Sequence, residues 1–396
     1  MHVVVIGGGA SGLVSAITIA RRHIDVTIIE KNNSICKKVL ITGNGKCNYF
    51  NSDMGMSHYR SMDNDLLTGL ITEERINLVQ NFFDTIGVVP RMKNGYYYPY
   101  SNTATTIKNM LLLEAKRLNI KIITDNVVNK IVKKEYFVLK TNKDDIVCDK
   151  VVLALGSKAA IKDEYNGYTL LKELGHHIIK PLPALVMLEG KGNYFKDWAG
   201  IRSDARVSLY CNNQLIDEEE GEVQLTNYGI SGICIMNLSG RVARMLDDHK
   251  KVILKINFMP FITDINLYLD NRSKLLPHCT IIEMLESIIN YKLLYVILKE
   301  CHLDYNMCWD DLNSTAKQLL IDNLCHFALE IIGTKGFDNA QVVSGGVSLK
   351  DIDNSFESKI IPGLYIVGEL LDVDGDCGGY NLGFAWISGI TVGDNI

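Results

Sequence analysis

A glycine-rich turn near the start of the chain has the residue types and the spacing that bind a pyrophosphate. The stretch 7–12 reads GGGASG and fits the pattern G-x-G-x-x-G, with Ala10 and Ser11 before Gly12. Such a pattern makes a tight turn at Gly7, lets the backbone approach the pyrophosphate at Gly9, and directs the amide N–H groups of a helix start at the anion. An apolar run precedes the turn and helical periodicity follows it, so we predict a dinucleotide-binding turn.

A carboxylate at Glu30 supports the same kind of ligand. Glu30 ends the next apolar run, about 20 residues after the turn, where a carboxylate binds the ribose hydroxyls of a dinucleotide. Lys31 follows it directly. An acidic residue at this place favours an unphosphorylated ribose, so the expected ligand is FAD or NAD and not NADP.

A second glycine-rich turn separates FAD from NAD. The stretch 39–51, VLITGNGKCNYFN, places Gly43 and Gly45 among three residues that offer side-chain hydrogen bonds, which are Thr42, Asn44 and Asn48. A nicotinamide cofactor has no use for this second turn. The longer FAD needs further backbone amides and polar side chains along its ribityl chain and ring. The second turn therefore predicts FAD.

Two later stretches indicate the same ligand. VVLALGS, 151–157, reads as a buried strand that ends at Gly156, where flavoproteins commonly bring the chain back across the nucleotide. GLYIVGE, 363–369, ends in Glu369, whose carboxylate can hold ribityl hydroxyls. A helix that starts at about 380–383 would direct its N–H dipoles at the N1/O2 edge of the flavin.

Three residues near these stretches are candidates for catalysis, namely Cys47, Tyr98 and Tyr100. A thiol beside a flavin can be redox-active, but the loop around Cys47 lacks the second cysteine that a disulfide reductase needs. The aromatic stretch 91–101, RMKNGYYYPYS, offers phenols as proton donors or as a wall of a substrate pocket. The sequence does not select one catalytic residue among them.

The elements that must position these residues follow an α/β pattern at both ends of the chain. A strand at 3–6, a helix after the first turn and a strand at 24–30 make the βαβ unit of a parallel sheet. Further helices are expected at 73–87 and 103–118, and a final helix at 382–396.

The middle of the chain reads as an insertion. The stretch 188–261 reads as strands, and the stretch 262–332 as leucine-rich helices with almost no glycine. We therefore expect a FAD-binding domain in two parts, 1–187 and 342–396, around an inserted domain at 188–341 that consists of a β-rich part and a helical cap.

Composition bears on partners, location and metals. The 396 residues carry a formal net charge of -5, and their basic pairs are short and scattered, so we expect no nucleic-acid partner. No apolar stretch reaches the length of a membrane span, and the first strand leaves no room for a signal peptide, so a cytoplasmic protein without membrane contact is expected. The ten cysteines show no CxxC pair and no metal-ligand spacing with histidine, so no metal site is expected.

The motifs together resemble a known family. The set GGGASG, KKVLITGNGKCNYFN, YYYPYSNTA, LTNYGISG, VVSGGV and GLYIVGELLDVDGDCGGYNLGFAWISG is similar to the YhiN/BaiN-like family of FAD-binding flavoproteins, also labelled NAD(P)/FAD-dependent oxidoreductases or aminoacetone oxidase-like proteins. The resemblance implies an α/β fold, a glutathione-reductase-type FAD-binding Rossmann-like domain with an inserted β-barrel-like and helical domain. It implies FAD contacts at Gly7, Gly9, Ser11, Gly12, Glu30, Lys31, Lys38, Thr42, Gly43, Asn44, Cys47, Asn48, Gly156, Gly368, Glu369, Gly379, Asn381 and Leu382. The predicted cofactor site also includes Ala10, Gly45, Val128 and Ala154.

We predict an FAD-dependent oxidoreductase that reduces a small organic substrate with electrons from NADH or NADPH. A second G-x-G-x-x-G after a strand is missing, so a nicotinamide would bind only transiently at the flavin. Two alternatives stay open: a flavin oxidase of a small amine or alcohol that uses oxygen, and a non-enzymatic flavin-binding redox sensor. The substrate, the electron donor and the oligomeric state stay open as well.

Overall fold

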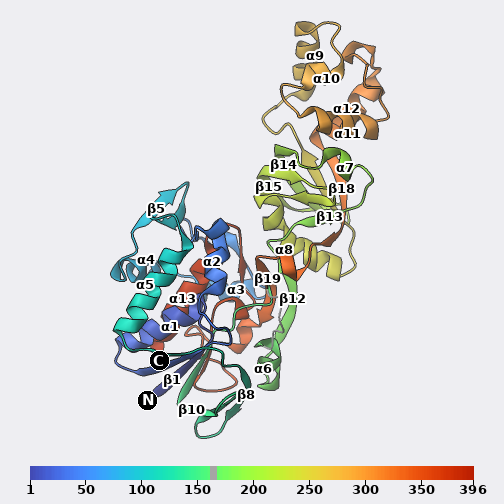
Figure 1. Ribbon diagram of the computed structural model, residues 1–396. Helices are drawn as coiled ribbons and strands as arrows, with labels where there is room; N and C mark the ends of the chain where they lie inside the picture. The colour runs from blue at the N-terminus through green and yellow to red at the C-terminus, as the bar shows by residue number, and fades with distance from the viewer. Residues whose placement is uncertain (161–166) are drawn as a thin grey trace. The chain divides into compact units, whose positions relative to one another are not determined.

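The structure, a computed structural model, describes residues 1–160 and 167–396, which form two compact units (Figure 1). Unit 1 comprises Met1–Pro181 and Val342–Ile396, and unit 2 comprises Leu182–Gln341. Each unit has its own hydrophobic core. The chain leaves unit 1 along β12 (Ile178–Ala184) and returns along β19 (Val342–Val347), and these two strands pair with each other.

Unit 1 is built on a five-stranded parallel sheet. Its strands, in spatial order, are β20 (Leu364–Ile366), β11 (Lys150–Leu153), β1 (His2–Ile6), β2 (Asp25–Ile29) and β7 (Lys121–Ile123). In the centre, Val4 of β1 lies opposite Val151 on one side and Thr27 on the other. These strands are nearly continuous apolar runs because a parallel sheet is covered on both faces. The predicted Rossmann-like fold is confirmed.

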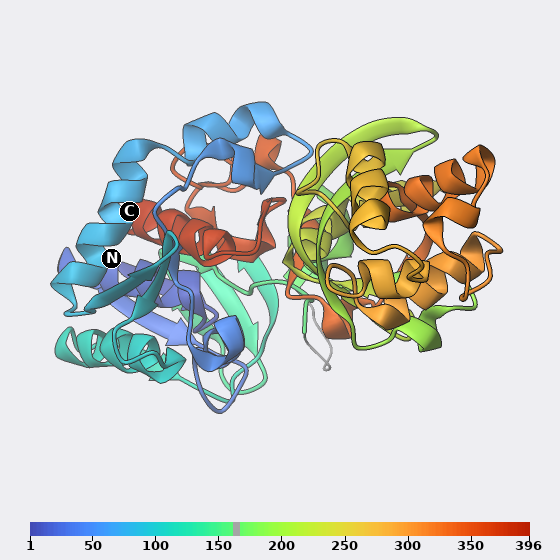
Figure 2. The same ribbon diagram turned by 90° about the horizontal axis from the view of Figure 1, so that it is seen from above.

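Helices of unit 1 include the three expected from periodicity, observed as α4 (Glu73–Thr85), α5 (Ala104–Arg117) and α13 (Tyr380–Asn395). The others are α1 (Ala10–Arg21), α2 (Lys37–Ile41), α3 (Asn64–Leu70) and α6 (Gly167–Glu173). The C-terminal α13 packs against both α1 and α4 (Figures 1 and 2).

Two glycines of α13 allow its close approach to α1. A Cβ atom on Gly389 would lie 2.4 Å from Val14 Cγ2 and 2.5 Å from the carbonyl oxygen of Ser11. A Cβ atom on Gly393 would lie 2.3 Å from Thr18 Cβ. Because α1 carries the first glycine turn at its start, this contact also fixes where that turn stands.

Smaller sheets complete unit 1. An antiparallel sheet contains β8 (Val128–Lys133), β9 (Phe137–Thr141) and β10 (Ile146–Cys148); a second contains β3 (Phe50–Asn51), β6 (Tyr96–Pro99) and β5 (Pro90–Lys93); and β4 (Tyr59–Arg60) pairs with β21 (Asp374–Gly375). Asn94 and Gly95 join β5 to β6 with positive φ angles of 52° and 82°. The Asn-Gly pair thus forms the tight hairpin turn that its sequence indicates.

Unit 2 contains a closed six-stranded barrel. Its strands, in spatial order, are β13 (Leu188–Gly190), β16 (Gly229–Ser231), β15 (Gln214–Leu225), β14 (Arg202–Cys211), β17 (Val252–Asn257) and β18 (Phe327–Thr334). Its helices are α7 (Phe195–Trp198), α8 (Ile233–Asp247), α9 (Ile265–Leu275), α10 (Ile281–Leu285), α11 (Tyr291–Glu300) and α12 (Ser314–Cys325). In Figure 1, α8 lies at one end of the barrel and α9 to α12 lie at the other.

Unit 2 differs from the expected pattern in two elements. The stretch expected to be β-rich also contains α8, whose buried Ile235, Leu238 and Val242 recur at the spacing of one helix face. The stretch expected to be helical up to residue 332 ends earlier, and β18 follows, with Phe327, Leu329 and Ile331 buried in strict alternation with their neighbours. In both places the spacing of the buried side chains, and not the leucine or valine content, determines whether the segment forms a helix or a strand.

Within residues 1–160 and 167–396, no helix is long and apolar enough to cross a membrane.

Candidate functional site

The first glycine turn joins β1 to α1 and is tightly packed except at one residue. Gly7 has a φ angle of +108°, and a Cβ atom there would lie 2.3 Å from the carbonyl oxygen of Ala154. A Cβ atom on Gly12 would lie 2.0 Å from the carbonyl oxygen of Gly7. At Gly9, the residue before α1, a Cβ atom would meet nothing within 4 Å, and no side chain caps the first turn of the helix. The turn is therefore open where a pyrophosphate is expected to approach.

Glu30 lies directly after β2, is 7% exposed, and holds two neighbouring turns. Its Oε2 accepts a hydrogen bond from Gly8 N at 2.8 Å, and its Oε1 accepts one from Asn32 N at 2.8 Å. Lys31 beside it is exposed. Asn126 N donates to the carbonyl oxygen of Glu30 at 3.0 Å, while the buried Asn126 Oδ1 accepts no hydrogen bond from any described residue.

The second glycine turn, Thr42–Gly45, follows α2 and does not have the backbone of a regular helix. Gly43, Asn44 and Gly45 all have positive φ angles, of 54°, 53° and 78°. Thr42 Oγ1 donates to the carbonyl oxygen of Val39 at 2.7 Å and so ends the helix. The two glycines fit here because a left-handed backbone is strained for other residues.

Cys47 follows this turn and is buried. Burial raises the pKa of its thiol to about 11, although a hydrogen bond with Thr42 acts in the opposite direction. Burial also raises the pKa of Cys36 to about 12. None of the ten cysteines forms a disulfide, and the thiols of Cys36 and Cys47 keep their protons at neutral pH, so the structure gives no support to a thiolate at Cys47.

Asn48 links the second turn to the start of α13. Its Oδ1 atom is buried and accepts no hydrogen bond from the residues described. Gly379 precedes α13 with a φ angle of +96°, and a Cβ atom there would lie 3.0 Å from Asn48 Oδ1 and 2.7 Å from the carbonyl oxygen of Phe50. The second turn and the C-terminal helix, more than 300 residues apart in sequence, therefore meet at this point.

Lys38, Ser157 and Glu369 form a polar cluster between three of the predicted stretches. Lys38 Nζ lies 2.7 Å from Glu369 Oε2, and Ser157 Oγ lies 3.3 Å from Lys38 Nζ and 3.2 Å from the same carboxylate oxygen. A Cβ atom on Gly368 would lie 2.6 Å from Ser11 Oγ, so the first turn adjoins the same cluster. Gly156 has a φ angle of +69°, and a Cβ atom there would meet nothing within 4 Å.

Four other predicted site residues have structural contacts or buried positions in unit 1. Asn381 holds the loop before α13, since its Oδ1 accepts from Gly375 N and its Nδ2 donates to Gly375 O, both at 2.8 Å. Val128 is buried at the start of β8, and Leu382 is half-buried in α13. Ala154 N donates to the carbonyl oxygen of Ile6 at 2.9 Å at the end of β11.

The two tyrosine candidates lie in different surroundings. Tyr98 is half-buried in β6, and its Cε1 atom would lie 3.8 Å from a Cβ atom on Gly43, so its ring lies beside the second turn. Burial raises the pKa of Tyr98, with a smaller contribution from Tyr96. Tyr100 lies beyond the strand and is 69% exposed. The structure thus brings Tyr98 and not Tyr100 to the predicted cofactor loop.

A charged network beside α13 escaped the sequence patterns. His58 Nδ1 lies 3.0 Å from Asp376 Oδ2, and His58 Nε2 lies 3.3 Å from Asp53 Oδ2. Arg60 pairs with the other oxygen of Asp376. The residues come from two distant stretches, 53–60 and the turn-rich loop that contains Asp376, and the pairing of β4 with β21 brings them together.

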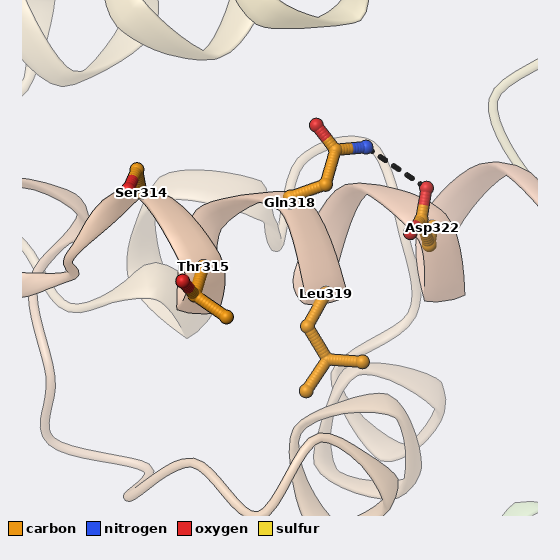
Figure 3. A pocket seen from close by; sticks show the side chains of 5 residues that line it. All are labelled: Ser314, Thr315, Gln318, Leu319 and Asp322. Atoms are coloured by element: carbon orange, nitrogen blue, oxygen red, sulfur yellow. Dashed lines mark hydrogen bonds between the residues drawn. The ribbon is translucent and has the colours of Figure 1, made fainter.

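A surface hollow in unit 2 is unrelated to these residues. It is lined by Ser314, Thr315, Gln318, Leu319 and Asp322 (Figure 3). All five belong to α12, and Gln318 Nε2 donates to Asp322 Oδ1 at 2.9 Å. Side chains of a single helix do not converge on a ligand, so we assign this hollow no function. Among the described residues, no group of three or more His, Cys, Asp or Glu side chains is arranged to hold a metal ion.

The arrangement in unit 1 fits FAD. Two buried acceptors, Asn48 Oδ1 and Asn126 Oδ1, lack a donor among the described residues, and a buried acceptor without a donor costs free energy unless a ligand supplies one. Gly9 and Gly156 leave open space beside the backbone. Asn126 adjoins Glu30 and the first turn, and Asn48 adjoins the start of α13, so the unpartnered acceptors lie at both of these predicted contact points.

Known proteins are similar over the whole chain. Residues 1–395 match the family described as HI0933-like protein Rossmann domain. The 3-dehydro-bile acid delta(4,6)-reductase of Clostridium scindens is 36% identical over 409 residues, which cover 98% of this chain and 97% of that protein. The ribosomal RNA dihydrouridine synthase of Haemophilus influenzae is 25% identical over 405 residues, which cover 97% and 96%. A solved structure of an open flavocytochrome c3 fumarate reductase aligns with a TM-score of 0.49 at 15% identity and covers 100% of this chain and 77% of that one.

The fold and the site define an FAD-dependent oxidoreductase with a Rossmann-type domain. The chain belongs to the HI0933-like family, and the predicted resemblance is confirmed. The predicted cofactor, FAD, and the predicted class of enzyme are confirmed with it. The expectation that nucleic acid is excluded as a partner finds no support, because two relatives are named for ribosomal RNA.

Proposed function

We propose that this enzyme reduces a carbon–carbon double bond conjugated to a carbonyl group in a small organic molecule. The names of two relatives support this reaction. A 3-dehydro-bile acid with delta(4,6) unsaturation carries double bonds conjugated to a ketone, and dihydrouridine forms when the ring double bond of uridine, which is conjugated to a carbonyl, is reduced. In both substrates the carbonyl stabilises the negative charge that develops when hydride adds to the far carbon.

The observation that carries the proposal is the unpartnered Asn48 Oδ1 beside the first turn of α13. FAD supplies hydride transfer when it is bound there. In this proposal the amides after Gly9 bind the pyrophosphate, Glu369 and Lys38 hold ribityl hydroxyls, and Asn48 accepts a hydrogen bond from the ring. The start of α13 adds a positive dipole end that favours negative charge on the reduced ring.

A small molecule is favoured over RNA as the substrate. The formal net charge of -5 and the scattered basic residues do not supply the positive surface that phosphate contacts require. We place the reaction in the cytoplasm, where ten cysteines without a disulfide stay reduced. Unit 1 is then the FAD-binding domain in two parts, and unit 2 is the inserted domain.

NADH or NADPH is the proposed electron donor, and an anaerobic titration tests it together with the substrate class. The flavin absorbance at about 450 nm is followed during addition of NADH and then NADPH. A 3-oxo-4-ene steroid or a uridine-containing oligoribonucleotide is added next, and air last. Bleaching by a nicotinamide and recovery with the steroid support the proposal. Recovery only with the oligonucleotide contradicts the small-molecule assignment, and recovery only with air indicates an oxidase. Absence of bleaching by either nicotinamide rules out the proposed donor.

A further inference from the structure

Tyr380, the first residue of α13, has a fixed ring and an uncommitted hydroxyl. The residue is 6% exposed. Its ring stacks on the His58 ring at a centroid distance of 4.4 Å and an interplanar angle of 18°, and it meets the Tyr59 ring edge-on at 5.9 Å. The hydroxyl of Tyr380 makes no hydrogen bond with any described residue, and it is not among the buried polar atoms that lack a partner, so it reaches the surface of unit 1. A phenol held in this way can donate its proton to a molecule bound at that surface.

The ring of Tyr380 lies at the end of the predicted flavin site. A Cβ atom on Gly378 would lie 2.8 Å from Tyr96 Cε1 and 3.0 Å from Tyr380 Cε2, so the two rings flank this glycine. The next residue, Gly379, adjoins the unpartnered Asn48 Oδ1. Tyr380 therefore stands within two residues of the backbone that we assign to the ring of FAD.

The groups that face Tyr380 keep its proton in place. Burial raises the pKa of Tyr380 well above its usual value of 10.0, and Asp53, Asp376 and Tyr96 raise it further. The His58 ring that covers one face of Tyr380 is held by the same two carboxylates. The hydroxyl is therefore present as the protonated acid throughout the neutral and mildly alkaline range.

We propose that Tyr380 is the catalytic acid that protonates the substrate carbon next to the carbonyl group, and that His58 and Asp376 position it. This inference rests on the proposed function. Hydride from the reduced cofactor adds two electrons and one hydrogen to the far carbon of the double bond. The O–H bond of Tyr380 breaks, a C–H bond forms at the carbon next to the carbonyl, and water returns a proton to the phenolate. The double bond gains two hydrogens, and the cofactor ends oxidised.

The substitution Tyr380→Phe tests the proposal because it removes the hydroxyl and keeps the stacked ring. We expect the holoenzyme variant to bind FAD fully, to bleach with the donor at the wild-type rate, and to melt within about 2 °C of the wild type. The rate at which a 3-oxo-4-ene steroid reoxidises the reduced flavin should fall at least about 100-fold, the range for loss of a general acid. Binding of the steroid to the oxidised enzyme, followed by the perturbed flavin spectrum, should stay within about threefold, because the hydroxyl acts only on the reacting carbon.

Two further variants make the outcome specific. Tyr136→Phe removes a phenol hydroxyl from a residue 48% exposed in the turn after β8, and it should reoxidise at the wild-type rate. Tyr98→Phe tests the competing phenol. Wild-type reoxidation in Tyr380→Phe overturns the inference, and so does a loss confined to Tyr98→Phe. If the wild-type enzyme itself reduces no conjugated double bond, the proposed function fails first and this inference fails with it, a pattern distinct from an active wild type with an equally active Tyr380→Phe.

Discussion

Gly7 and Gly9 stand two residues apart in the first turn, but the chain requires glycine at each for a different reason. A Cβ atom at Gly9 meets no protein atom within 4 Å, and its backbone is in an ordinary extended conformation with φ at -82°. We therefore expect Gly9→Ala to leave the unfolding free energy of the FAD-free protein within about 0.5 kcal/mol of the wild type. The added methyl group occupies the approach to the pyrophosphate, so the Kd for FAD should rise at least about tenfold. Urea unfolding and flavin-fluorescence titration measure the two effects.

Gly7→Ala is the matched control for this prediction. Its Cβ atom would lie 2.3 Å from a backbone oxygen, and its φ angle of +108° is strained for alanine. We expect a loss of about 2 kcal/mol or more in the stability of the FAD-free protein. If Gly9→Ala binds FAD with wild-type affinity, the pyrophosphate does not bind at this turn and the prediction is wrong.

The sequence could reveal site residues whose positions are fixed by the backbone of a local motif. Gly7, Gly9 and Glu30 have a fixed spacing because the βαβ unit imposes it. His58 and Tyr380 have no such spacing, since a strand pairing and a helix start bring them together across 322 residues, the difference between their numbers. The ring contact between them is a tertiary property, and no local pattern encodes it.

The contact between α1 and α13 depends on small residues in one helix. A methyl group on Gly389 would meet the backbone oxygen of Ser11 at 2.5 Å as well as Val14, and backbone atoms of a packed helix do not yield easily. We expect Gly389→Ala to destabilise the protein by about 2–3 kcal/mol in urea unfolding. Because α1 carries the first turn, its displacement should also weaken FAD binding.

Gly383→Ala in the same helix provides the comparison. Its Cβ atom would meet the terminal Cε of Met54 at 2.2 Å, and a flexible methionine end can move aside. We expect a change below about 1 kcal/mol, because alanine also favours a helix more than glycine does. If Gly389→Ala and Gly383→Ala lower the unfolding free energy equally, the loss comes from replacing a helix glycine and not from the contact with α1.

Helices could be predicted from the sequence where one hydrophobic periodicity extends over a long stretch. The helices α4, α5 and α13 begin and end within two residues of their expected bounds. The helix α8 was missed because it lies between strands and is short of charged residues in its first two turns. The closed barrel was expected only through the family resemblance, which is confirmed. No local pattern encodes it, because closure requires β13 to pair with β18, far apart in sequence.

The whole molecule contains two separate cores, and the FAD residues that we assign all belong to unit 1. A ligand stabilises only the folded unit that binds it, by about 2.7 kcal/mol at 100 times its Kd. We therefore expect FAD removal to lower one of two calorimetric transitions by about 5–10 °C and to leave the other in place. Calorimetry of the holoprotein and the FAD-free protein makes the comparison, and equal shifts of both transitions would contradict independent cores.

The strands β12 and β19 have a consequence for descent. They lie side by side, so the backbone enters and leaves residues 182–341 at neighbouring points, with Lys180 O only 2.5 Å from where a Cβ atom of Gly345 would stand. A gene for such a chain can therefore gain, lose or exchange residues 182–341 through two breakpoints that lie close together in space, without interrupting the dinucleotide-binding fold. We expect a laboratory chimera with its junctions in β12 and β19 to keep a folded FAD-binding unit.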